Sequence, residues 1–217
     1  MEFSQDGLAS VAVDLLVFTI DEDRLKLLTI RRQYPPFEGQ RALPGVFVRD
    51  DETLDQAARR GLREETGLED IYFEQLYTWG APDRDPRRRV ISVSYLALVD
   101  AQRLRGFGPG LRTTGAELSD VQALLGAEDL AFDHRQIIAC GRERLAGKVE
   151  YTPIAFSLVP EEFTLPQLQR VYEILLGKPL YKANFRKKIA PLVEETDRST
   201  SGDAHRPSKY YRLRQMQ

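Results

Sequence analysis

Periodic apolar residues predict the elements of this chain. Two stretches rich in β-branched and apolar residues flank the acidic segment Asp21-Glu22-Asp23, which indicates a hairpin of long strands. Other stretches repeat their apolar residues with the helical period of about 3.6. Strands are expected at 8–20, 25–30, 72–78 and 90–99, and helices at 53–66, 119–125 and 133–145. Mixed strands flanked by helices are typical of an α/β sandwich.

Single residues mark where two of the helices begin and end. Thr53-x-x-Gln56 and Thr164-x-x-Gln167 have the spacing of a capping box, in which the two side chains bond each other's backbone amides. Gly67 and Gly177 follow the two apolar stripes, and glycine readily takes the left-handed conformation that ends a helix. The sequence therefore predicts both ends of one helix in each half of the chain.

A second module with a different pattern begins near residue 151. An apolar stripe over 165–175 predicts one helix, and a second helix is expected from about 182 until Pro191 ends or kinks it near Ala190. A polar segment at 199–208 and an alternating strand at 210–214 follow. Helix, glycine turn, basic helix and hairpin form the pattern of a winged helix-turn-helix.

The second of these helices has a basic polar face. Phe185 and Ile189 should turn toward the core, which leaves the cationic and amide side chains in solvent. Arginine and lysine neutralise phosphates or read guanine, and asparagine can pair with adenine. A dimerisation module with a basic exterior is the alternative interpretation. The expected DNA contacts are Lys182, Asn184, Arg186, Lys187 and Lys188 and, beside the wing, Arg206 and Lys209.

Composition and charge favour a cytoplasmic protein with two unlike modules. The chain has 217 residues, 42% of them hydrophobic, and no apolar run reaches the roughly 18 residues of a membrane helix. Cys140 is the only cysteine, which excludes an internal disulfide. Residues 151–217 hold 11 Lys and Arg against 7 Asp and Glu, whereas residues 1–150 hold 20 against 26. The basic second module suits a polyanionic partner.

The segment between residues 43 and 68 resembles a Nudix box. That box reads glycine, five residues, glutamate, seven residues, then Arg-Glu-apolar-x-Glu-Glu-x-Gly-apolar. When the pattern is aligned on Gly67, the chain departs from it at two positions. Val46 occupies the position of the first glycine, and Gly61 occupies that of the first glutamate of the helix. The box residues that remain in place are Glu52, Arg60, Glu64 and Glu65.

The glutamate missing at position 61 bears on metal binding. Residues at i, i+3 and i+4 share a helix face, so positions 61, 64 and 65 would direct three carboxylates into one pocket. Mg²⁺ needs such anionic oxygen ligands. Glu64 and Glu65 would be the ligands if the site retains a metal, and a surface pair between Glu64 and Arg60 is the alternative. We expect no required cofactor and no catalytic residue.

A wider resemblance extends over residues 9–213. The motifs that carry it are Leu43-Pro44-Gly45-Val46-Phe47-Val48, Arg84-Asp85-Pro86-Arg87, Ala131-Phe132-Asp133-His134, Tyr151-Thr152-Pro153, Phe163-Thr164-Leu165 and Asn184-Phe185-Arg186-Lys187-Lys188. In this order they are similar to the Nudix-related transcriptional regulators of NAD metabolism, many of which have a decayed box. The resemblance implies a Nudix sandwich with a mixed sheet between helices at 1–150, followed by a winged helix-turn-helix at 151–217.

The same resemblance implies a homodimeric repressor of NAD biosynthesis or salvage genes. Its first domain would bind ADP-ribose or a related NAD-derived nucleotide, and its second would bind double-stranded operator DNA. Arginine can hold phosphates in bidentate geometry, and a surface turn with a local ion pair is the alternative interpretation of 84–87. His134 is expected to cap the helix that follows it. The expected effector-binding residues are Arg41, Gly45, Asp83, Arg84, Asp85 and Arg87.

Two other functions remain open at this stage. Glu52, Glu64 and Glu65 are compatible with an active ADP-ribose pyrophosphatase that carries an accessory C-terminal domain. Under that interpretation, replacing Gly61 with glutamate should raise any residual activity. A regulator of the same architecture that responds to a sugar instead of a nucleotide is the third hypothesis.

Overall fold

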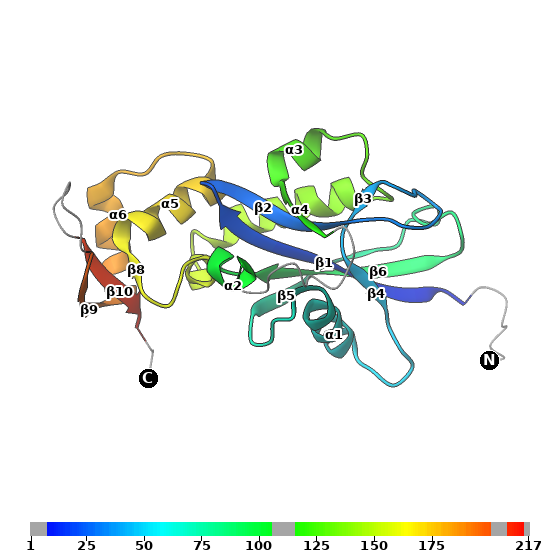
Figure 1. The fold of residues 1–217 in the computed structure, drawn as a ribbon, viewed down its shortest axis with the longest axis horizontal. Coiled ribbons are helices and arrows are strands. Elements are labelled where there is room, and N and C mark those ends of the chain that lie inside the picture. The colour runs from blue at the N-terminus through cyan, green and yellow to red at the C-terminus, as the bar shows by residue number, and fades with distance from the viewer. Residues whose placement is uncertain (1–7, 106–115, 201–207, 215–217) are drawn as a thin grey trace.

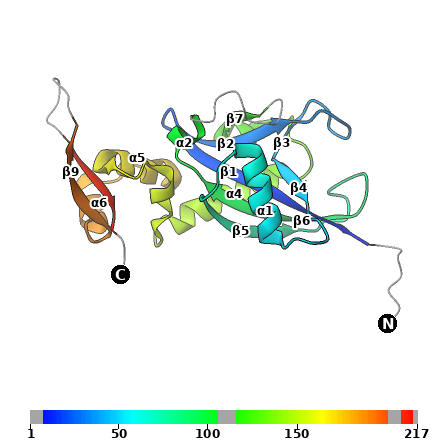
Figure 2. The ribbon, with the colours of Figure 1, turned by 60° about the horizontal axis from the view of Figure 1, so that its bottom comes forward.

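A computed structural model describes residues 8–105, 116–200 and 208–214. The chain forms a larger module built on a mixed sheet and a smaller one that holds a three-stranded sheet (Figure 1). The smaller module lies at one end of the larger one in both ribbon views (Figures 1 and 2). None of the helices in the described ranges is long and apolar enough to cross a membrane.

Strand β1 (Ser10–Asp21) forms the centre of the larger sheet. It pairs antiparallel with β2 (Arg24–Arg31) and parallel with β6 (Val90–Leu98). Glu22 and Asp23 link β1 to β2 with φ of 51° and 58°, the positive values that a two-residue hairpin turn requires. The remaining strands are β3 (Arg41–Ala42), β4 (Gly45–Phe47) beside β1, β5 (Tyr72–Trp79) beside β6, and β7 (Glu117–Asp120) beside β2.

Helices cover both faces of this sheet because the buried residues of β1 alternate between them. Leu15 and its neighbours two residues away pack with α1 (Leu54–Thr66), whereas Leu16 and Phe18 pack with α4 (His134–Lys148). Figure 2 shows α1 in front of the sheet. The expected α/β sandwich is therefore confirmed. The short helices α2 (Ala101–Arg105) and α3 (Val121–Gly126) complete the module.

The capping signals are confirmed, and one helix start is wrong. Both capping boxes form, and Gly67 and Gly177 take φ of 68° and 67° at the ends of their helices. The helix expected from residue 119 begins at Val121 instead. Residues 117–120 pair with β2 as a strand, and the Asp120 side chain then accepts the Ala123 amide at 2.9 Å to start α3.

The smaller module is a winged helix, as expected. Its helices α5 (Leu165–Leu176) and α6 (Lys182–Ile189) are joined by a short turn, and Pro191 lies in the 3₁₀ turn η3 (Ala190–Leu192) that follows α6. The strands form the sheet β8-β10-β9. The remaining elements are η2 (Pro153–Leu158), β8 (Phe163–Thr164), β9 (Val193–Ser199) and β10 (Lys209–Leu213).

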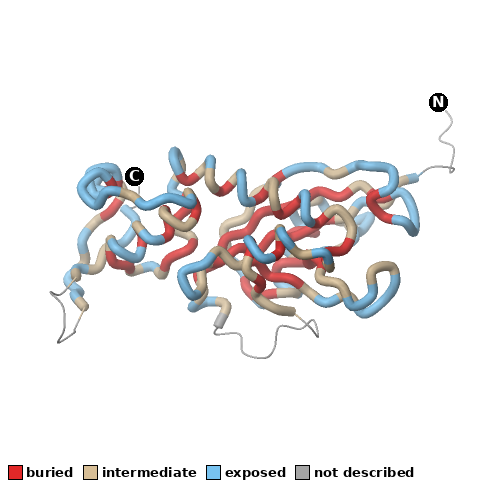
Figure 3. Tube along the Cα trace, turned by 90° about the horizontal axis from the view of Figure 1, so that it is seen from above, coloured by how far each residue is buried: buried red, intermediate tan, exposed pale blue. Residues whose placement is uncertain are grey.

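One apolar cluster runs through both modules. It joins Leu16 and Ile137 of the larger module to Leu168 and Tyr172 of α5, with Ile154 of η2 between them. Buried segments accordingly continue from the sheet into the winged helix (Figure 3). The two modules therefore share a core, and a displacement of one is resisted by the packing of the other.

Candidate functional site

The Nudix-type loop and helix are held by Arg60. Its guanidinium forks onto Glu52, with Nε–Oε2 and Nη2–Oε1 distances of 3.0 and 2.5 Å, and donates to the Phe47 carbonyl at 3.0 Å. The hydrogen bonds from Arg60 lower the pKa of Glu52 to about 2. Glu64 lies 3.6 Å from Arg60, which is the surface pair considered above. Arg60 and Glu52 therefore fix the loop to the helix.

The described box residues do not form a three-carboxylate cluster. Within the described residues, no group of three or more His, Cys, Asp or Glu side chains is placed to hold an ion. Glu64 is half exposed and pairs with Arg60, and Glu65 has an interaction of its own. Position 61 is a buried glycine that faces Leu15 and Val46. Mg²⁺ is usually bound by one or two protein carboxylates. The box pattern places three, at positions 61, 64 and 65, and this chain has only the two at 64 and 65.

A cavity of about 200 Å³ lies between β1, β4 and the segments 84–87 and 132–134. Gly45, Arg84, Asp85 and Arg87 line it, as the sequence suggests for an effector pocket, whereas Arg41 and Asp83 do not. Ligand pockets usually measure roughly 300–1,000 Å³, so a dinucleotide would extend beyond this cavity over the surface. The other lining residues are Ala12, Val13, Asp14, Ile30, Arg32, Ala42, Leu43, Val46, Phe47, Val90, Phe132 and His134.

Arg41 and Asp83 lie away from the cavity. The Arg41 guanidinium forks onto Asp129, with Nε–Oδ2 and Nη2–Oδ1 distances of 3.0 and 2.5 Å. The hydrogen bond with Asp129 raises the pKa of Arg41. Asp83 is exposed in the loop before Arg84. Arg41 is thus engaged in a structural ion pair that joins β3 to the segment before α4.

Arg84 forms the floor of the cavity. Its side chain is 5% exposed and bonds both oxygens of Asp133, at 2.9 and 2.7 Å, and one oxygen of Asp14, at 3.0 Å. Ser92 donates to the same Asp14 oxygen at 2.6 Å. Burial opposes the charge of Arg84, but these partners raise its pKa overall. Arg84 therefore crosslinks β1 to the start of α4.

His134 lies in the same wall and has a different role from the one expected. Its Nδ1 accepts the Leu43 amide at 2.9 Å, and the α4 N-cap has no side-chain hydrogen bond. Burial lowers the pKa of His134, which keeps the imidazole neutral so that Nδ1 can accept. The expectation that His134 caps α4 is wrong. It fixes the Leu-Pro-Gly turn against that helix instead.

Two arginines flank an aromatic ring at the edge of the cavity. The guanidinium carbons of Arg32 and Arg87 lie 4.8 and 5.9 Å from the centroid of the Phe132 ring. Arg87 also forks onto Asp85 at 3.0 and 2.7 Å, whereas Arg32 forms no ion pair within the described ranges. Burial and the like charge of Arg87 lower the pKa of Arg32. This unbalanced positive charge is suited to an anionic ligand.

Sequence reasoning missed Arg32, Phe132 and Asp14 as pocket residues. Arg32 and Asp14 lie outside the recognised motifs, and Phe132 lies in one of them without an expected role in the pocket. The three residues are far apart in the sequence, which hides their proximity in the fold. A usable signal was present for Arg32, because a cation directly follows the strand that ends at Arg31. Phe132 has a φ of 54°, an uncommon value for an aromatic residue, and this conformation is visible only in the fold.

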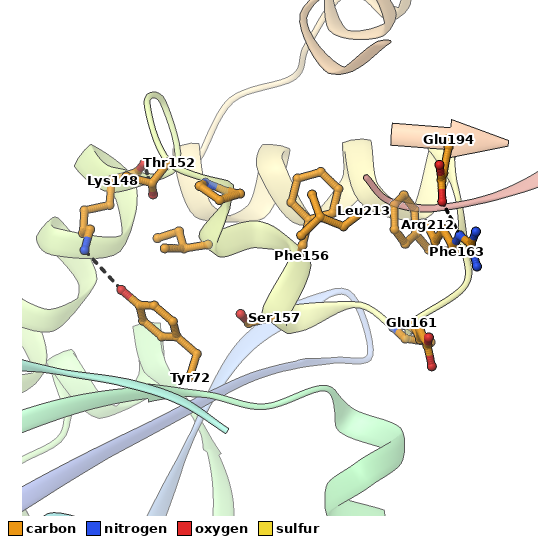
Figure 4. Close-up of a pocket in the computed structure, with 13 residues that line it drawn as sticks. Tyr72, Lys148, Thr152, Phe156, Ser157, Glu161, Phe163, Glu194, Arg212 and Leu213 are labelled. Carbon is orange, nitrogen blue, oxygen red and sulfur yellow. Dashed lines mark hydrogen bonds and ion pairs between the residues drawn. The ribbon is translucent and has the colours of Figure 1, made fainter. Parts of the chain in front are cut away.

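A larger cavity of about 730 Å³ lies between the two modules (Figure 4). None of the residues expected at either site lines it. The cations of its wall are already paired, Lys148 with Glu74 and Arg212 with Glu194. The smaller cavity is lined by Gly45, Arg84, Asp85 and Arg87 of the expected effector site and by Arg32, which forms no ion pair in the described ranges, so it is the candidate site despite its smaller volume.

The exposed face of α6 carries the cations expected to contact DNA. Lys182, Asn184, Arg186 and Lys187 are all exposed, while Phe185 and Ile189 are buried on the opposite face. The three cations among these four form no ion pair within the described residues. An exposed helix with unneutralised positive charge is the arrangement that a major groove accepts.

Lys188 and the wing differ from this pattern. The Lys188 ammonium donates to the Glu150 carbonyl at 3.0 Å and lies 5.4 Å from the Tyr172 ring centroid, so it points toward the junction of the modules. Lys209 is paired with Glu195. Arg206 lies outside the described residues. In the described part of the wing, Arg198 and Arg212 are also paired with glutamates.

Comparisons with known proteins agree with this two-module arrangement. The model of the NUDIX domain matches residues 10–139, and that of the NrtR DNA-binding winged helix domain matches residues 155–213. The ADPR responsive transcriptional repressor NtrR of Acinetobacter baylyi is 37% identical over 209 residues, which cover 94% of this chain and 81% of the relative. An ADP-ribose pyrophosphatase of Methanocaldococcus jannaschii is 40% identical over 129 residues, 59% of this chain and 70% of that protein.

Solved structures extend the similarity to both modules. NrtR of Shewanella oneidensis complexed with a 27mer DNA superimposes with a TM-score of 0.85 and 36% identity, over 94% of this chain and 93% of that one. The NUDIX domain of the same protein complexed with ADP ribose superimposes with a TM-score of 0.54 and 33% identity, over 64% of this chain and 89% of that one. Fold and comparisons thus define a NUDIX domain joined to a winged helix. The chain belongs to the Nudix family and, within it, to the NrtR regulators.

Proposed function

We propose that this chain is a DNA-binding repressor of NAD biosynthesis or salvage genes that is controlled by ADP-ribose or a related NAD-derived nucleotide. It acts in the cytoplasm as a homodimer, with an effector domain at residues 1–150 and a reader domain at 151–217. The observation that carries this proposal is the unpaired basic face of α6, on a module whose core is continuous with the Nudix pocket. The DNA and ADP ribose complexes of Shewanella oneidensis NrtR support both ligands.

The pocket charges indicate how the effector is held. Arg32, which lacks a carboxylate partner in the described structure, supplies positive charge for the pyrophosphate, and Arg87 would add to it on leaving its partner Asp85. The half-buried Phe132 ring beside them packs edge-on against Phe37 and offers its remaining apolar surface to a base or ribose. Gly45 and Asp85 complete the wall, and Arg84, which also lines the cavity, holds the wall in place through Asp14 and Asp133. Lys182, Asn184, Arg186 and Lys187 make the principal DNA contacts.

Regulation follows from linkage between the two sites. An effector that prefers one arrangement of the modules changes DNA affinity by the same factor by which DNA changes effector affinity. Couplings of about 1–3 kcal/mol correspond to roughly 5–150-fold. The shared apolar core supplies a physical connection over which such a preference can act.

A gel shift tests the proposal. The protein is incubated with its own upstream DNA and titrated separately with ADP-ribose, NAD and pentoses. We expect specific binding whose midpoint moves at least fivefold with ADP-ribose or NAD. A shift by pentoses alone would establish the sugar-responsive alternative, and no specific shift of any DNA would contradict the repressor.

An active hydrolase is the second candidate, favoured by the 40% identity to the ADP-ribose pyrophosphatase of Methanocaldococcus jannaschii. Incubation with Mg²⁺ and ADP-ribose, followed by chromatography of the nucleotides, distinguishes the two. Because no three-carboxylate cluster exists in the described chain, we expect little or no AMP. Rapid turnover would establish the enzyme instead.

A further inference from the structure

The two departures from the Nudix box lie against each other. An ideal Cβ built on Gly61 would lie 3.4 Å from both methyl groups of Val46 and 2.9 Å from Leu15 Cδ1. Val46 is opposite Val13 in the pairing of β4 with β1, so both side chains face α1. A distance of 2.9 Å between carbon atoms is too short for a normal contact, so a side chain at 61 requires its neighbours to move.

We infer that Val46 fills the space in which the missing glutamate would begin, and that positions 46 and 61 form one coupled steric pair. With glycine at 46, as in the family pattern, the two close contacts to the Val46 methyl groups disappear and only the short contact to Leu15 remains. Leu15 then gains a space into which its Cδ1 can rotate. With valine at 46, the fully buried Leu15 packs in a cluster against which the Val46 side chain lies, so the two side chains compete for that space. Glycine at 61 is therefore the residue that Val46 permits.

This inference changes the expectation for restoring a cation site. It rests on the proposed function, in which the box binds a nucleotide without hydrolysing it. Gly61→Glu alone places a carboxylate stem against Val46 and Leu15 and should disturb the packing of α1. Val46→Gly combined with Gly61→Glu provides the third carboxylate and the space for it. Only the double variant should therefore bind a hard divalent cation through positions 61, 64 and 65.

A thermal-stability cycle tests the steric part. Gly61→Ala is made alone and with Val46→Gly, and Gly141→Ala is the matched control in the same two backgrounds. Gly141 lies on the other face of the sheet, where a Cβ would meet Leu16 at 2.6 Å. We expect Gly61→Ala to lower the Tm by several degrees beside Val46 and by less than half as much beside glycine. Gly141→Ala should lower the Tm by the same amount with valine or with glycine at position 46. Equal losses for Gly61→Ala would overturn the inference.

Mn²⁺ binding tests the chemical part. Isothermal titration calorimetry compares the wild type, Gly61→Glu and the double variant. We expect at least tenfold tighter Mn²⁺ binding in the double variant than in Gly61→Glu. Equal affinity in these two variants would refute the coupling. Neither assay depends on DNA, so a failed gel shift would reject the repressor and leave this result standing.

Discussion

At the residue scale, Arg84 shows how a pocket residue can be structural. Its guanidinium is almost completely buried and neutralises Asp14 and Asp133, which come from two different elements. Removing one member of a buried charge network leaves the others without a partner in a low-dielectric environment, which is costlier than the original interaction was favourable. Arg84 should therefore affect stability more than effector contact.

Replacing Arg84 with alanine tests this assignment. Leaving Asp14 and Asp133 uncompensated should lower the free energy of unfolding by about 3–5 kcal/mol. Arg63→Ala is the control, because its pair with Glu69 is exposed at 3.8 Å and such pairs contribute about 0–1 kcal/mol. Urea denaturation measures both. A loss for Arg84→Ala no larger than that of the control would contradict the network.

Glu52 gives a prediction that depends on pH. Its folded-state pKa is about 2, below the ordinary 4.5, so Arg60 stabilises the ionised form. That contribution is present above pH 4.5 and is lost as the pH falls toward 2. The Tm of wild type should exceed that of Glu52→Gln at pH 7, and the difference should narrow below pH 4.5. A constant difference between pH 7 and pH 3 would exclude this linkage.

Sequence patterns identified residue types at the sites better than their partners. Gly45, Asp85 and Arg87 line the cavity as expected, because the family motifs place them on adjoining loops. Arg41 is engaged by Asp129, 88 residues away, and Arg84 by Asp14, 70 residues away. Ion pairs between such distant positions depend on strand register and leave no local signal. For the same reason the polar partners of Lys188 and Lys209 were not foreseen.

At the element scale, α6 and the wing differ in available charge. The cations of α6 at positions 182, 186 and 187 form no ion pair in the described structure, whereas Arg198, Lys209 and Arg212 of the described wing each form one. DNA phosphates gain most from cations that need not first leave a carboxylate. The helix should thus dominate binding to the DNA backbone.

Lys187→Ala tests the charge of α6, with Lys209→Ala as a matched control. Each phosphate contact contributes about 0.9 to the slope of log affinity against log salt concentration. We expect Lys187→Ala to reduce this slope by about 1 and Lys209→Ala to change it little, because Glu195 already pairs with Lys209. Fluorescence anisotropy across a salt series gives both slopes. A greater reduction for Lys209→Ala would assign the contacts to the wing.

Elements with local signals were predicted, and short ones that depend on distant partners were not. Thr53 with Gln56, and Thr164 with Gln167, fix their helix starts through contacts three residues apart. Strands β3 and β4 have two and three residues and exist because β2 and β1 lie beside them. Such strands have no periodicity of their own, because two or three residues cannot display an alternation.

At the scale of the whole molecule, the shared core should make the two modules unfold together. Trp79 is the only tryptophan and its fluorescence reports on the larger module alone, whereas helical circular dichroism reports on both modules, through α1 and α4 in the larger and α5 and α6 in the smaller. We expect the two signals to give coincident urea midpoints. ADP-ribose should raise both midpoints by the same amount, because it binds only the folded state. Separate midpoints would show that the continuous core does not couple the modules.

The arginines at the edge of the smaller cavity, Arg32 and Arg87, also affect which molecules the regulator responds to in a cell. Enzymes that hold a pyrophosphate through Mg²⁺ recognise a complex of nucleotide and metal, so their occupancy varies with the free concentrations of both. Here Arg32 supplies positive charge beside Phe132 that no carboxylate in the described residues pairs, and the described carboxylates do not form a metal cluster. Effector binding should therefore survive a chelator such as EDTA. The fraction of the regulator with effector bound would then depend on the nucleotide concentration and stay constant while intracellular magnesium fluctuates.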